Sequence, residues 1–282
     1  MPELPEVETV RRAIAPVMED RILAKVIVRR RDLRRPVPPG LEERLSGQRI
    51  THVARLAKYL LIHVEDESAL LFHLGMTGHL MVLPDTLPPP PPAKHDHMDL
   101  ITDDGCVVRF RDARRFGLVD LIEPGGLTTH KLVQGMGPDP LSNSFGGEVL
   151  AARLKGRVGA IKPLLMDQRL VAGIGNIYAS ESLFRAGISP RRKAGSVQGG
   201  RARKLAGAIR QVLADAVEAG GSSIRDHALP DGKLGYFQHY FSVYGRDGEA
   251  CPGCDCDIEQ SGGIKKMVQG GRSTFYCSRR QR

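Results

Sequence analysis

The sequence predicts an α+β protein, in which an N-terminal β-sandwich or barrel with flanking helices precedes a helical domain and a C-terminal β-hairpin. Three observations support this fold class. Between residues 22 and 122, short segments rich in Val, Ile and Leu alternate with Gly, Asp and Pro, as in antiparallel sheet proteins. Beyond residue 147 the apolar residues take helical spacing. Four of the five cysteines lie in the last 32 residues, where the hairpin is predicted.

The N-terminal part begins with a predicted amphipathic helix over residues 5–18, because valines and an isoleucine between Val7 and Val17 recur at helical spacing. Short strands are expected after it over residues 22–30, 48–56, 59–64, 69–74, 79–83, 98–103, 106–111 and 117–122. Cys106 lies in one of them and is expected to be buried. The prolines of 88–92 predict an exposed polyproline II loop.

The second half of the chain changes in composition. Residues 123–147 are rich in Gly, Pro, Ser and Asn and are predicted to connect two domains. Helices are expected beyond them over residues 147–155, 176–186 and 199–219. Gly220-Gly221 ends the last helix, and residues 222–245 are expected to form a long loop. The predicted domain boundaries are 1–125, 126–146, 147–245 and 246–282.

The chain of 282 residues carries a net charge of +9 and has a sequence pI near 9.5. Basic residues gather in 185–210 and after Glu259, and neither stretch holds an acidic residue. A one-sided basic surface favours a polyanion, first of all nucleic acid; a solvated basic face without a ligand is the alternative. No apolar run is long enough to span a bilayer, and the acidic N-terminus lacks the layout of a secretory signal. We therefore expect a cytoplasmic protein without a membrane partner, and a monomer by default.

A proline follows the initiator methionine and heads the run Pro2-Glu3-Leu4-Pro5-Glu6. If Met1 is removed, the nitrogen of Pro2 becomes a secondary amine, and an α-amino pKa lies near ~8 in the unperturbed case. Such an amine forms covalent imine-type intermediates, and Glu3 and Glu6 are close enough to act as acid or base. The alternative is that proline and acids simply open a helix, where both are favoured.

Several motifs follow one another in an order that is specific when taken together. They are Pro2–Thr9, Ala57–Leu60, His73–Gly78, Lys94–His97, Asp112–Gly117, Ile161–Pro163, Gly173–Glu181 and Gly271–Cys277. In this order they resemble the formamidopyrimidine-DNA glycosylase family over nearly the full length. The resemblance implies an N-terminal β-sandwich carrying the proline-led helix, a helix-two-turn-helix domain and a C-terminal zinc-finger-like β-hairpin.

The resemblance also implies an activity. A bifunctional DNA glycosylase and AP lyase would remove oxidised purines, 8-oxoguanine and formamidopyrimidines, from double-stranded DNA opposite cytosine. Pro2 would attack C1′ of a nucleotide swung out of the duplex, form a Schiff base and cleave the strand by β,δ-elimination. Glu3 would supply acid–base help and Glu6 electrostatic support, although a helix N-terminal acid is the equal alternative for Glu6. Leu4 favours this branch over the endonuclease VIII type, which prefers oxidised pyrimidines.

Two rival interpretations belong to other functional classes. A non-catalytic lesion-binding protein would keep the basic surface but lose the free amine by retaining Met1. An abasic-site lyase would have only feeble glycosylase activity. Mass spectrometry of the N-terminus addresses the first, and parallel incubation with 8-oxoguanine and abasic duplexes addresses the second.

Further site residues follow from the resemblance. Lys58 is expected to bridge a phosphate at the lesion and assist elimination, with a solvated lysine as the alternative, and Arg272 is expected at the flanking phosphates. Other DNA contacts are implied for His73, His95, Arg157, Lys162 and Asn176. Asn176 is also expected to cap the helix that follows Gly173–Gly175.

A trio implied to enter the duplex would fill the hole left by the flipped nucleotide. Its members are Met76, Arg114 and Phe116. Positions in an ordinary core are the alternative for Met76 and Phe116. Residues 220–238 correspond to the family's lid over the damaged base, and small residues there suit closure.

The hairpin departs from the family's two Cys-x2-Cys pairs. Cys251 and Cys254 form one pair, but Arg280 stands where Cys277 should have its partner. Structural zinc takes four ligands. Three hypotheses stay open: zinc bound with Cys256 as the fourth ligand, zinc with an exogenous fourth ligand, or a metal-free hairpin. In the metal-free case, Arg272 would be held in place by the packing of Ile264, Val268 and Phe275.

Overall fold

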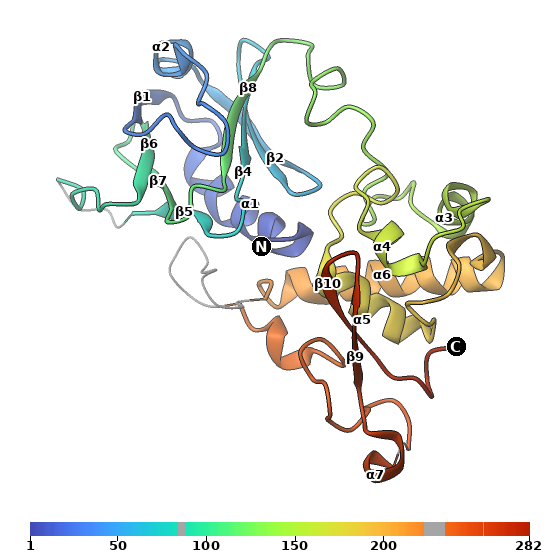
Figure 1. Cartoon of the computed structure of the whole chain (residues 1–282). Coiled ribbons are helices and arrows are strands. Elements are labelled where there is room, and N and C mark those ends of the chain that lie inside the picture. Colours follow the sequence, from blue (N-terminus) through green and yellow to red (C-terminus); the bar gives the residue numbers. More distant parts are fainter. Residues whose placement is uncertain (84–87, 223–234, 256) are drawn as a thin grey trace. The chain divides into compact units, whose positions relative to one another are not determined.

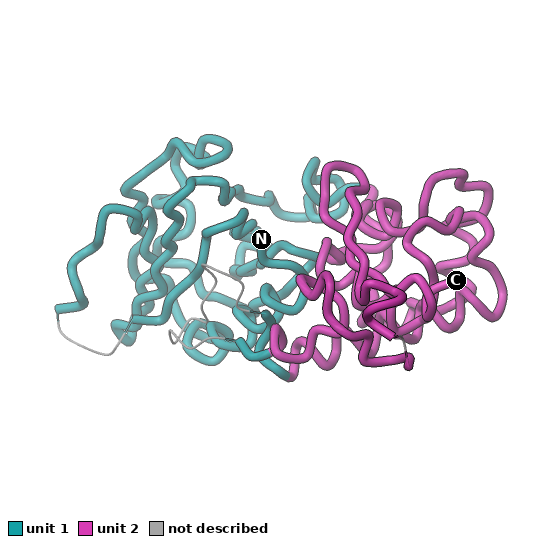
Figure 2. Tube along the Cα trace, turned by 60° about the horizontal axis from the view of Figure 1, so that its bottom comes forward, with its two compact units in different colours: residues 1–134, 219–236 teal, residues 135–218, 237–282 magenta. Residues whose placement is uncertain are grey.

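The computed structural model describes residues 1–83, 88–222, 235–255 and 257–282. These residues form two compact units, which Figure 2 shows in different colours. Unit 1 comprises residues 1–134 and 219–236, and unit 2 comprises residues 135–218 and 237–282. The described residues of 219–236 thus cluster with unit 1, and the four domain boundaries predicted above remain a proposal. No helix of the described ranges is long and apolar enough to cross a membrane.

Unit 1 is an antiparallel β-sandwich with one long helix (Figure 1). Its helices are α1 (Leu4–Met18) and α2 (Leu41–Leu45). Its strands are β1 (Leu23–Val28), β2 (Ile50–Leu56), β3 (Tyr59–Val64), β4 (Ala69–His73), β5 (Gly78–Val82), β6 (Asp96–Thr102), β7 (Val107–Asp112) and β8 (Leu118–Ile122). One sheet has the order β1-β6-β7-β5 and the other β2-β3-β4-β8. Each predicted strand and the first helix are confirmed, whereas α2 was not predicted because five residues show too little periodicity.

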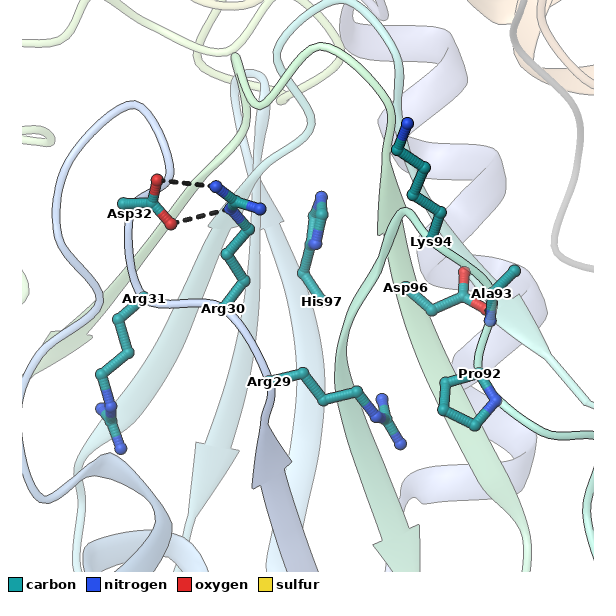
Figure 3. Close-up of a pocket in the computed structure, with 9 residues that line it drawn as sticks. All are labelled: Arg29, Arg30, Arg31, Asp32, Pro92, Ala93, Lys94, Asp96 and His97. Atoms are coloured by element: carbon teal, nitrogen blue, oxygen red, sulfur yellow. Dashed lines mark hydrogen bonds and ion pairs between the residues drawn. The ribbon is translucent and has the colours of Figure 1, made fainter.

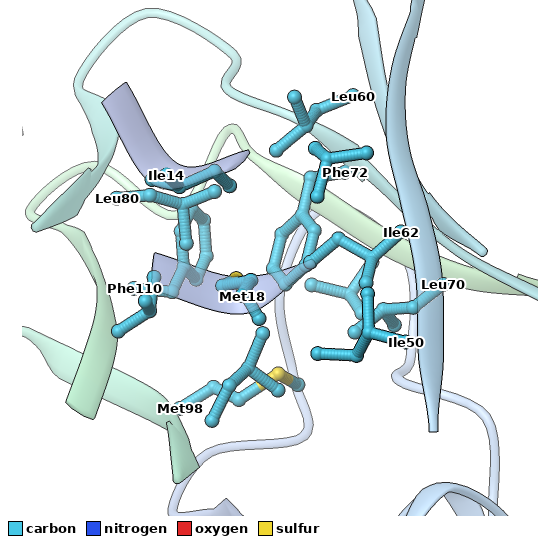
Figure 4. Packing of buried hydrophobic residues seen from close by; sticks show 14 of the residues in the cluster. Ile14, Met18, Ile50, Leu60, Ile62, Leu70, Phe72, Leu80, Met98 and Phe110 are labelled. Atoms are coloured by element: carbon cyan, nitrogen blue, oxygen red, sulfur yellow. The ribbon is translucent and has the colours of Figure 1, made fainter. Parts of the chain in front are cut away.

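The core of unit 1 lies between the two sheets and includes one face of α1 (Figure 4). Ile14 and Met18 of the helix are fully buried in the same cluster as Phe72 of β4 and Phe110 of β7. The rings of Phe72 and Phe110 come from different sheets, and their centroids lie 5.5 Å apart. Burying each such side chain contributes roughly 1.5–3 kcal/mol. This packing fixes α1 on the sandwich, so the residues at its N-terminus are held by a rigid element.

A buried ionic network crosses β6 and β7. The guanidinium of Arg109 donates to Asp99 through Nε at 2.8 Å, and both side chains are only 4% exposed. Arg109 also donates to the carbonyl of Pro90 at 2.9 Å, which ties the proline segment to the sheet. Residues 88–92 are exposed, as predicted, except for half-buried Pro89. Cys106, expected to be buried, is half-buried at the edge of a turn.

Unit 2 is helical and ends in the hairpin (Figure 1). Its helices are α3 (Gly147–Leu154), α4 (Ile161–Leu165), α5 (Asn176–Ala186), α6 (Gly200–Glu218) and α7 (Ile258–Ser261), with short 3-10 turns η1 (Ala194–Ser196) and η2 (Phe237–Tyr240). Its strands are β9 (Lys265–Gln269) and β10 (Arg272–Tyr276). The three predicted helices and the hairpin are confirmed. The elements that were not predicted have only three to five residues. Most of the loop predicted for 222–245 lies outside the described residues.

Candidate functional site

The N-terminus precedes α1 directly, and the carboxylate of Glu6 organises it. Glu6 is 2% exposed and lies at the third position of the helix. This position agrees with the alternative that Glu6 is a helix N-terminal acid. It accepts a hydrogen bond from the backbone N–H of Glu3 at 2.8 Å. It also accepts from the backbone N–H and the hydroxyl of Ser222, both at 2.8 Å. Glu6 therefore joins the start of α1 to a residue 216 positions further along the chain.

The α-amino group is surrounded by ionisable side chains. Burial lowers the pKa of the Met1 amine, the charges of Glu3 and Glu6 oppose this effect, and the charges of Lys58 and Arg114 add to it. Pro2 is buried, and Lys58 is only 7% exposed. The solvated alternative for Lys58 is therefore wrong. A lowered pKa leaves more of the Met1 amine unprotonated at neutral pH.

A sharp turn places Lys58 between β2 and β3. Ala57 adopts a left-handed conformation with φ of 57° and is 1% exposed. Leu56 and Tyr59 pair directly across this two-residue connection. The sequence gives no sign of the left-handed residue, because alanine rarely adopts it.

His73 ends β4 and is neutral at physiological pH. Burial, followed by the charges of Lys58 and Arg34, lowers the pKa of its imidazole to about 4. Its Nδ1 accepts a hydrogen bond from the backbone N–H of Gly75 at 3.1 Å. The ring proton therefore lies on Nε2, which makes His73 a neutral hydrogen-bond donor.

The predicted wedge residues project from two neighbouring turns. Met76 is 42% exposed and Phe116 is 45% exposed, so the core alternative is wrong for both. The guanidinium of Arg114 lies over the ring of Phe116, 4.6 Å from its centroid. Gly75 has φ of +64°, and a Cβ there would meet the backbone carbonyl carbon of Phe116 at 2.4 Å. The β4–β5 turn and the β7–β8 turn thus touch through their backbones.

Unit 1 also has a basic pocket of about 450 Å³ (Figure 3). Its lining includes Arg29, Arg30, Arg31 and Lys94, but none of the predicted site residues. Arg30 is paired with the neighbouring Asp32 at 2.7 Å. His95 is half-buried beside this lining and precedes β6.

Unit 2 holds Lys162 and Asn176 in one internal network. Lys162 is 1% exposed, and its Nζ donates to the Asn176 side-chain oxygen, to Thr274 Oγ1 at 2.8 Å and to the Ser273 carbonyl at 3.1 Å. Asn176 donates through Nδ2 to the Ser273 carbonyl at 3.0 Å and to the Tyr244 hydroxyl at 3.3 Å. The predicted capping by Asn176 is wrong, because the N-cap of α5 is Gly175 and Asn176 is the first helical residue. The network links α4 and α5 to the hairpin strand β10.

Two of the predicted DNA contacts of unit 2, Arg157 and Arg272, are exposed. Arg272 begins β10 after Gly270 and Gly271, whose φ values of 54° and 72° suit a two-residue hairpin turn. A small pocket of about 220 Å³ beside Arg272 is also lined by Met166 and Asp167. Arg157 is exposed and lines a separate basic pocket of about 380 Å³.

The hairpin gathers three cysteine sulfur atoms. The Sγ atoms of Cys251, Cys254 and Cys277 all lie within 4.8 Å of one another, so they could hold a metal ion. At the fourth ligand position, Arg280 donates its backbone N–H to Cys277 Sγ at 3.4 Å. Its guanidinium donates to the Gly253 carbonyl at 2.6 Å. Guanidinium has no lone pair for a metal, so the hairpin cysteines could supply three of the four ligands that structural zinc takes. Cys256 lies outside the described residues.

Apolar packing also holds the hairpin. Phe275 and Ile264 are buried in one cluster with Cys251 and Cys277. Val268, expected in this packing, is 71% exposed and takes no part. Successive side chains of β9 point to opposite faces of the hairpin, and Val268 lies on the same exposed face as Lys266.

Family models match both units. Residues 1–119 match the formamidopyrimidine-DNA glycosylase N-terminal domain, and residues 136–228 match the formamidopyrimidine-DNA glycosylase H2TH domain. A proline-led helix on an antiparallel sandwich, together with a helical unit ending in a cysteine hairpin, defines a DNA glycosylase of the helix-two-turn-helix class. The formamidopyrimidine-DNA glycosylase of Rhodospirillum rubrum is 54% identical over 282 residues, covering 100% of each chain. The chain belongs to the formamidopyrimidine-DNA glycosylase family.

Solved structures agree with this assignment. A mutant Fpg of Lactococcus lactis in complex with DNA containing Fapy-dG is 31% identical, with a TM-score of 0.87 and 100% of each chain covered. A MutM structure in complex with DNA containing carbocyclic 8-oxo-G is 32% identical, with a TM-score of 0.86 and again 100% of each chain covered. The likeness extends over the whole chain and includes both units.

Proposed function

We propose that this protein is a bifunctional DNA glycosylase and AP lyase that removes oxidised purines from double-stranded DNA. The supporting observation is the N-terminus of unit 1, where Pro2 is buried and the pKa of the preceding Met1 amine is lowered by burial, with Glu3, Glu6 and Lys58 acting on it through their charges. Relatives that were solved with DNA containing 8-oxo-G or Fapy-dG support the choice of lesion. The protein acts as a monomer in this proposal.

The chemistry starts when Met1 is removed and the Pro2 nitrogen becomes free. The nitrogen lone pair attacks C1′ of the extruded nucleotide, and the damaged base leaves with the electrons of the glycosidic bond. Glu3 gives and takes protons at the sugar as its ring opens to the iminium. The iminium acidifies the C2′ proton, so loss of that proton expels the 3′ phosphate; a second elimination expels the 5′ phosphate. Glu6 holds the helix start in place for these steps.

The remaining site residues bind DNA in this proposal. Lys58 places a buried cation at the lesion phosphate, and His73 donates from its neutral Nε2. Phosphate contacts come from His95, Arg157, Asn176 and Arg272. Lys162 is buried, so it positions Asn176 and the hairpin strand. Met76, Arg114 and Phe116 enter the gap in the duplex.

Cys251, Cys254 and Cys277 of the hairpin would hold a zinc ion, and Arg280 does not fit as the fourth ligand. No step of the reaction depends on a metal in this proposal. When bound, zinc would only stabilise the hairpin fold.

Borohydride trapping tests the proposed function. Wild-type protein is incubated with a duplex that contains one 8-oxoguanine, and the expected product is a covalent adduct at Pro2. Pro2→Gly and a form that retains Met1 serve as matched controls and give no adduct. A correctly processed N-terminus that fails to trap would refute the enzyme assignment. Faster trapping on a duplex with an oxidised pyrimidine would favour the endonuclease VIII type instead.

A further inference from the structure

Asp112 is a fully buried carboxylate beneath the two turns that carry the exposed residues Met76, Arg114 and Phe116. It ends β7 and is 0% exposed. Its Oδ1 accepts the hydroxyl of Thr77, from the β4–β5 turn, and the backbone N–H of Arg114 at 3.3 Å. Its Oδ2 accepts the backbone N–H of Gly117 at 2.7 Å. One side chain thus holds donors from both turns at once.

The surrounding contacts leave the carboxylate little freedom. The Asp112 carbonyl lies 2.7 Å from Nε2 of His97, which is itself 3% exposed. A Cβ at Gly117 would lie 2.8 Å from Asp112 Oδ2, so only glycine allows this close approach. On the outer side, Arg115 adopts a left-handed φ of 57° and its guanidinium donates to Asp32 at 2.8 Å. The β7–β8 turn is therefore held both by the Asp112 carboxylate and by the ion pair of Arg115 with Asp32.

We propose that Asp112 is a positioning residue that joins the two turns into a single wedge. Because it is buried, it touches neither a base nor a sugar and acts through Met76, Arg114 and Phe116. An exposed side chain that is already ordered loses less conformational entropy on insertion than a mobile one. Asp112 thus lowers the barrier to opening the duplex and leaves the chemistry at the sugar unchanged. This inference rests on the proposed function.

Two substitutions separate the carboxylate from the fold. Asp112→Asn keeps the shape, but its NH₂ group cannot accept, so donors of at least one turn lose their partner. Thr77→Val removes the hydroxyl that donates to Asp112 and that also accepts the backbone N–H of Arg114 at 3.1 Å. Thr77→Ser is the matched control that restores the hydroxyl. Excision of 8-oxoguanine in a single turnover should fall about tenfold or more in Asp112→Asn and in Thr77→Val, since one lost hydrogen bond to a buried charged acceptor has roughly that weight. Cleavage of a preformed abasic strand should change less than excision, and Thr77→Ser should recover the excision rate.

A double-mutant cycle and a fluorescent base complete the test. On a Phe116→Ala background, Asp112→Asn should cause little further loss, because both changes disable one wedge. A fluorescent base opposite the lesion should report weaker unstacking by Asp112→Asn, and this signal needs no chemistry. Additive losses, equal losses on both substrates or unchanged unstacking would each overturn the inference. If wild type unstacks the base but does not excise it, the proposed function fails while the role of Asp112 stands. If Asp112→Asn does not fold, the Thr77 pair decides.

Discussion

Replacement of Glu6 should loosen the start of α1 and the segment at Ser222 together. Its carboxylate accepts three buried hydrogen bonds, one from Glu3 and two from Ser222. Glu6→Ala leaves all three donors without this acceptor. Each buried donor without a partner costs about 1–3 kcal/mol, and water entering the gap recovers part of this cost, so we expect about 3–4 kcal/mol in total. Glu6→Gln keeps one oxygen, which can hold both Ser222 donors, and should cost about 1–2 kcal/mol at Glu3.

Hydrogen exchange of single amides measures this effect without assuming that both units unfold together. The amides of Glu3 and Ser222 should exchange at least tenfold faster in Glu6→Ala, the factor that corresponds to ~1.4 kcal/mol. In Glu6→Gln the Glu3 amide should respond more than the Ser222 amide. Unchanged protection of both amides in Glu6→Ala would refute the assignment of Glu6 as their shared acceptor.

The same substitution separates structure from amine chemistry. The negative charge of Glu6 raises the pKa of the Met1 amine, and we expect the same direction for the Pro2 nitrogen once Met1 is removed. Glu6→Gln should therefore lower that pKa and leave more free amine near neutral pH. The acidic limb of the trapping profile should then move to lower pH. If trapping nevertheless slows at every pH, the loss comes from the displaced helix start, since the amine itself has become more available.

Four further outcomes are expected. The pKa of His73 is about 4 in the folded protein and thus below its unfolded value. The contribution of neutral His73 to stability is therefore complete above pH ~6.5 and falls by up to about 3 kcal/mol as pH drops through 4. Urea titrations at several pH values should show this loss in the wild type and not in His73→Asn. Arg109→Met leaves buried Asp99 with less compensation and should lower stability by about 3–5 kcal/mol, measured by urea unfolding. Arg280→Cys supplies a fourth thiol and should raise the zinc content found by elemental analysis, with Cys251→Ser in the same chain as the control that removes it. DNA binding should weaken linearly in log–log plots as salt rises, and a salt-independent affinity would contradict the phosphate contacts.

The fold was largely predictable because the apolar residues of its longer helices and its strands follow a regular spacing. The strands of unit 1 alternate with turn residues, and α1 and α6 are long enough to show helical spacing. Helices such as α2 and α7 have one turn each and no measurable period. Their formation depends on neighbouring packing, which the local sequence does not record.

Burial of single site residues was less predictable. Met76 and Phe116 are apolar residues of the type usually found in a core, yet both are exposed. Lys58 and Lys162 are charged residues of the type usually found on the surface, yet both are buried. For Lys162 the reason is a set of oxygen acceptors more than 100 residues away in the chain. Residue type sets the average cost of burial, and tertiary partners decide the particular case.

Sequence analysis did not predict one role that three acidic residues share. Glu6, Asp112 and Glu181 are buried carboxylates, and each accepts from at least two backbone N–H groups. Glu181 binds three consecutive amides of residues 242–244, and Tyr244 in turn accepts from Asn176. Backbone amides are the same in every residue except proline, so the partner of such a carboxylate leaves no mark in the sequence. The motifs therefore include these acids, but which backbone amides each acid binds becomes visible only in the folded chain. This is why substitutions of these three carboxylates, and not only of Pro2, should determine how well the reactive residues are aligned.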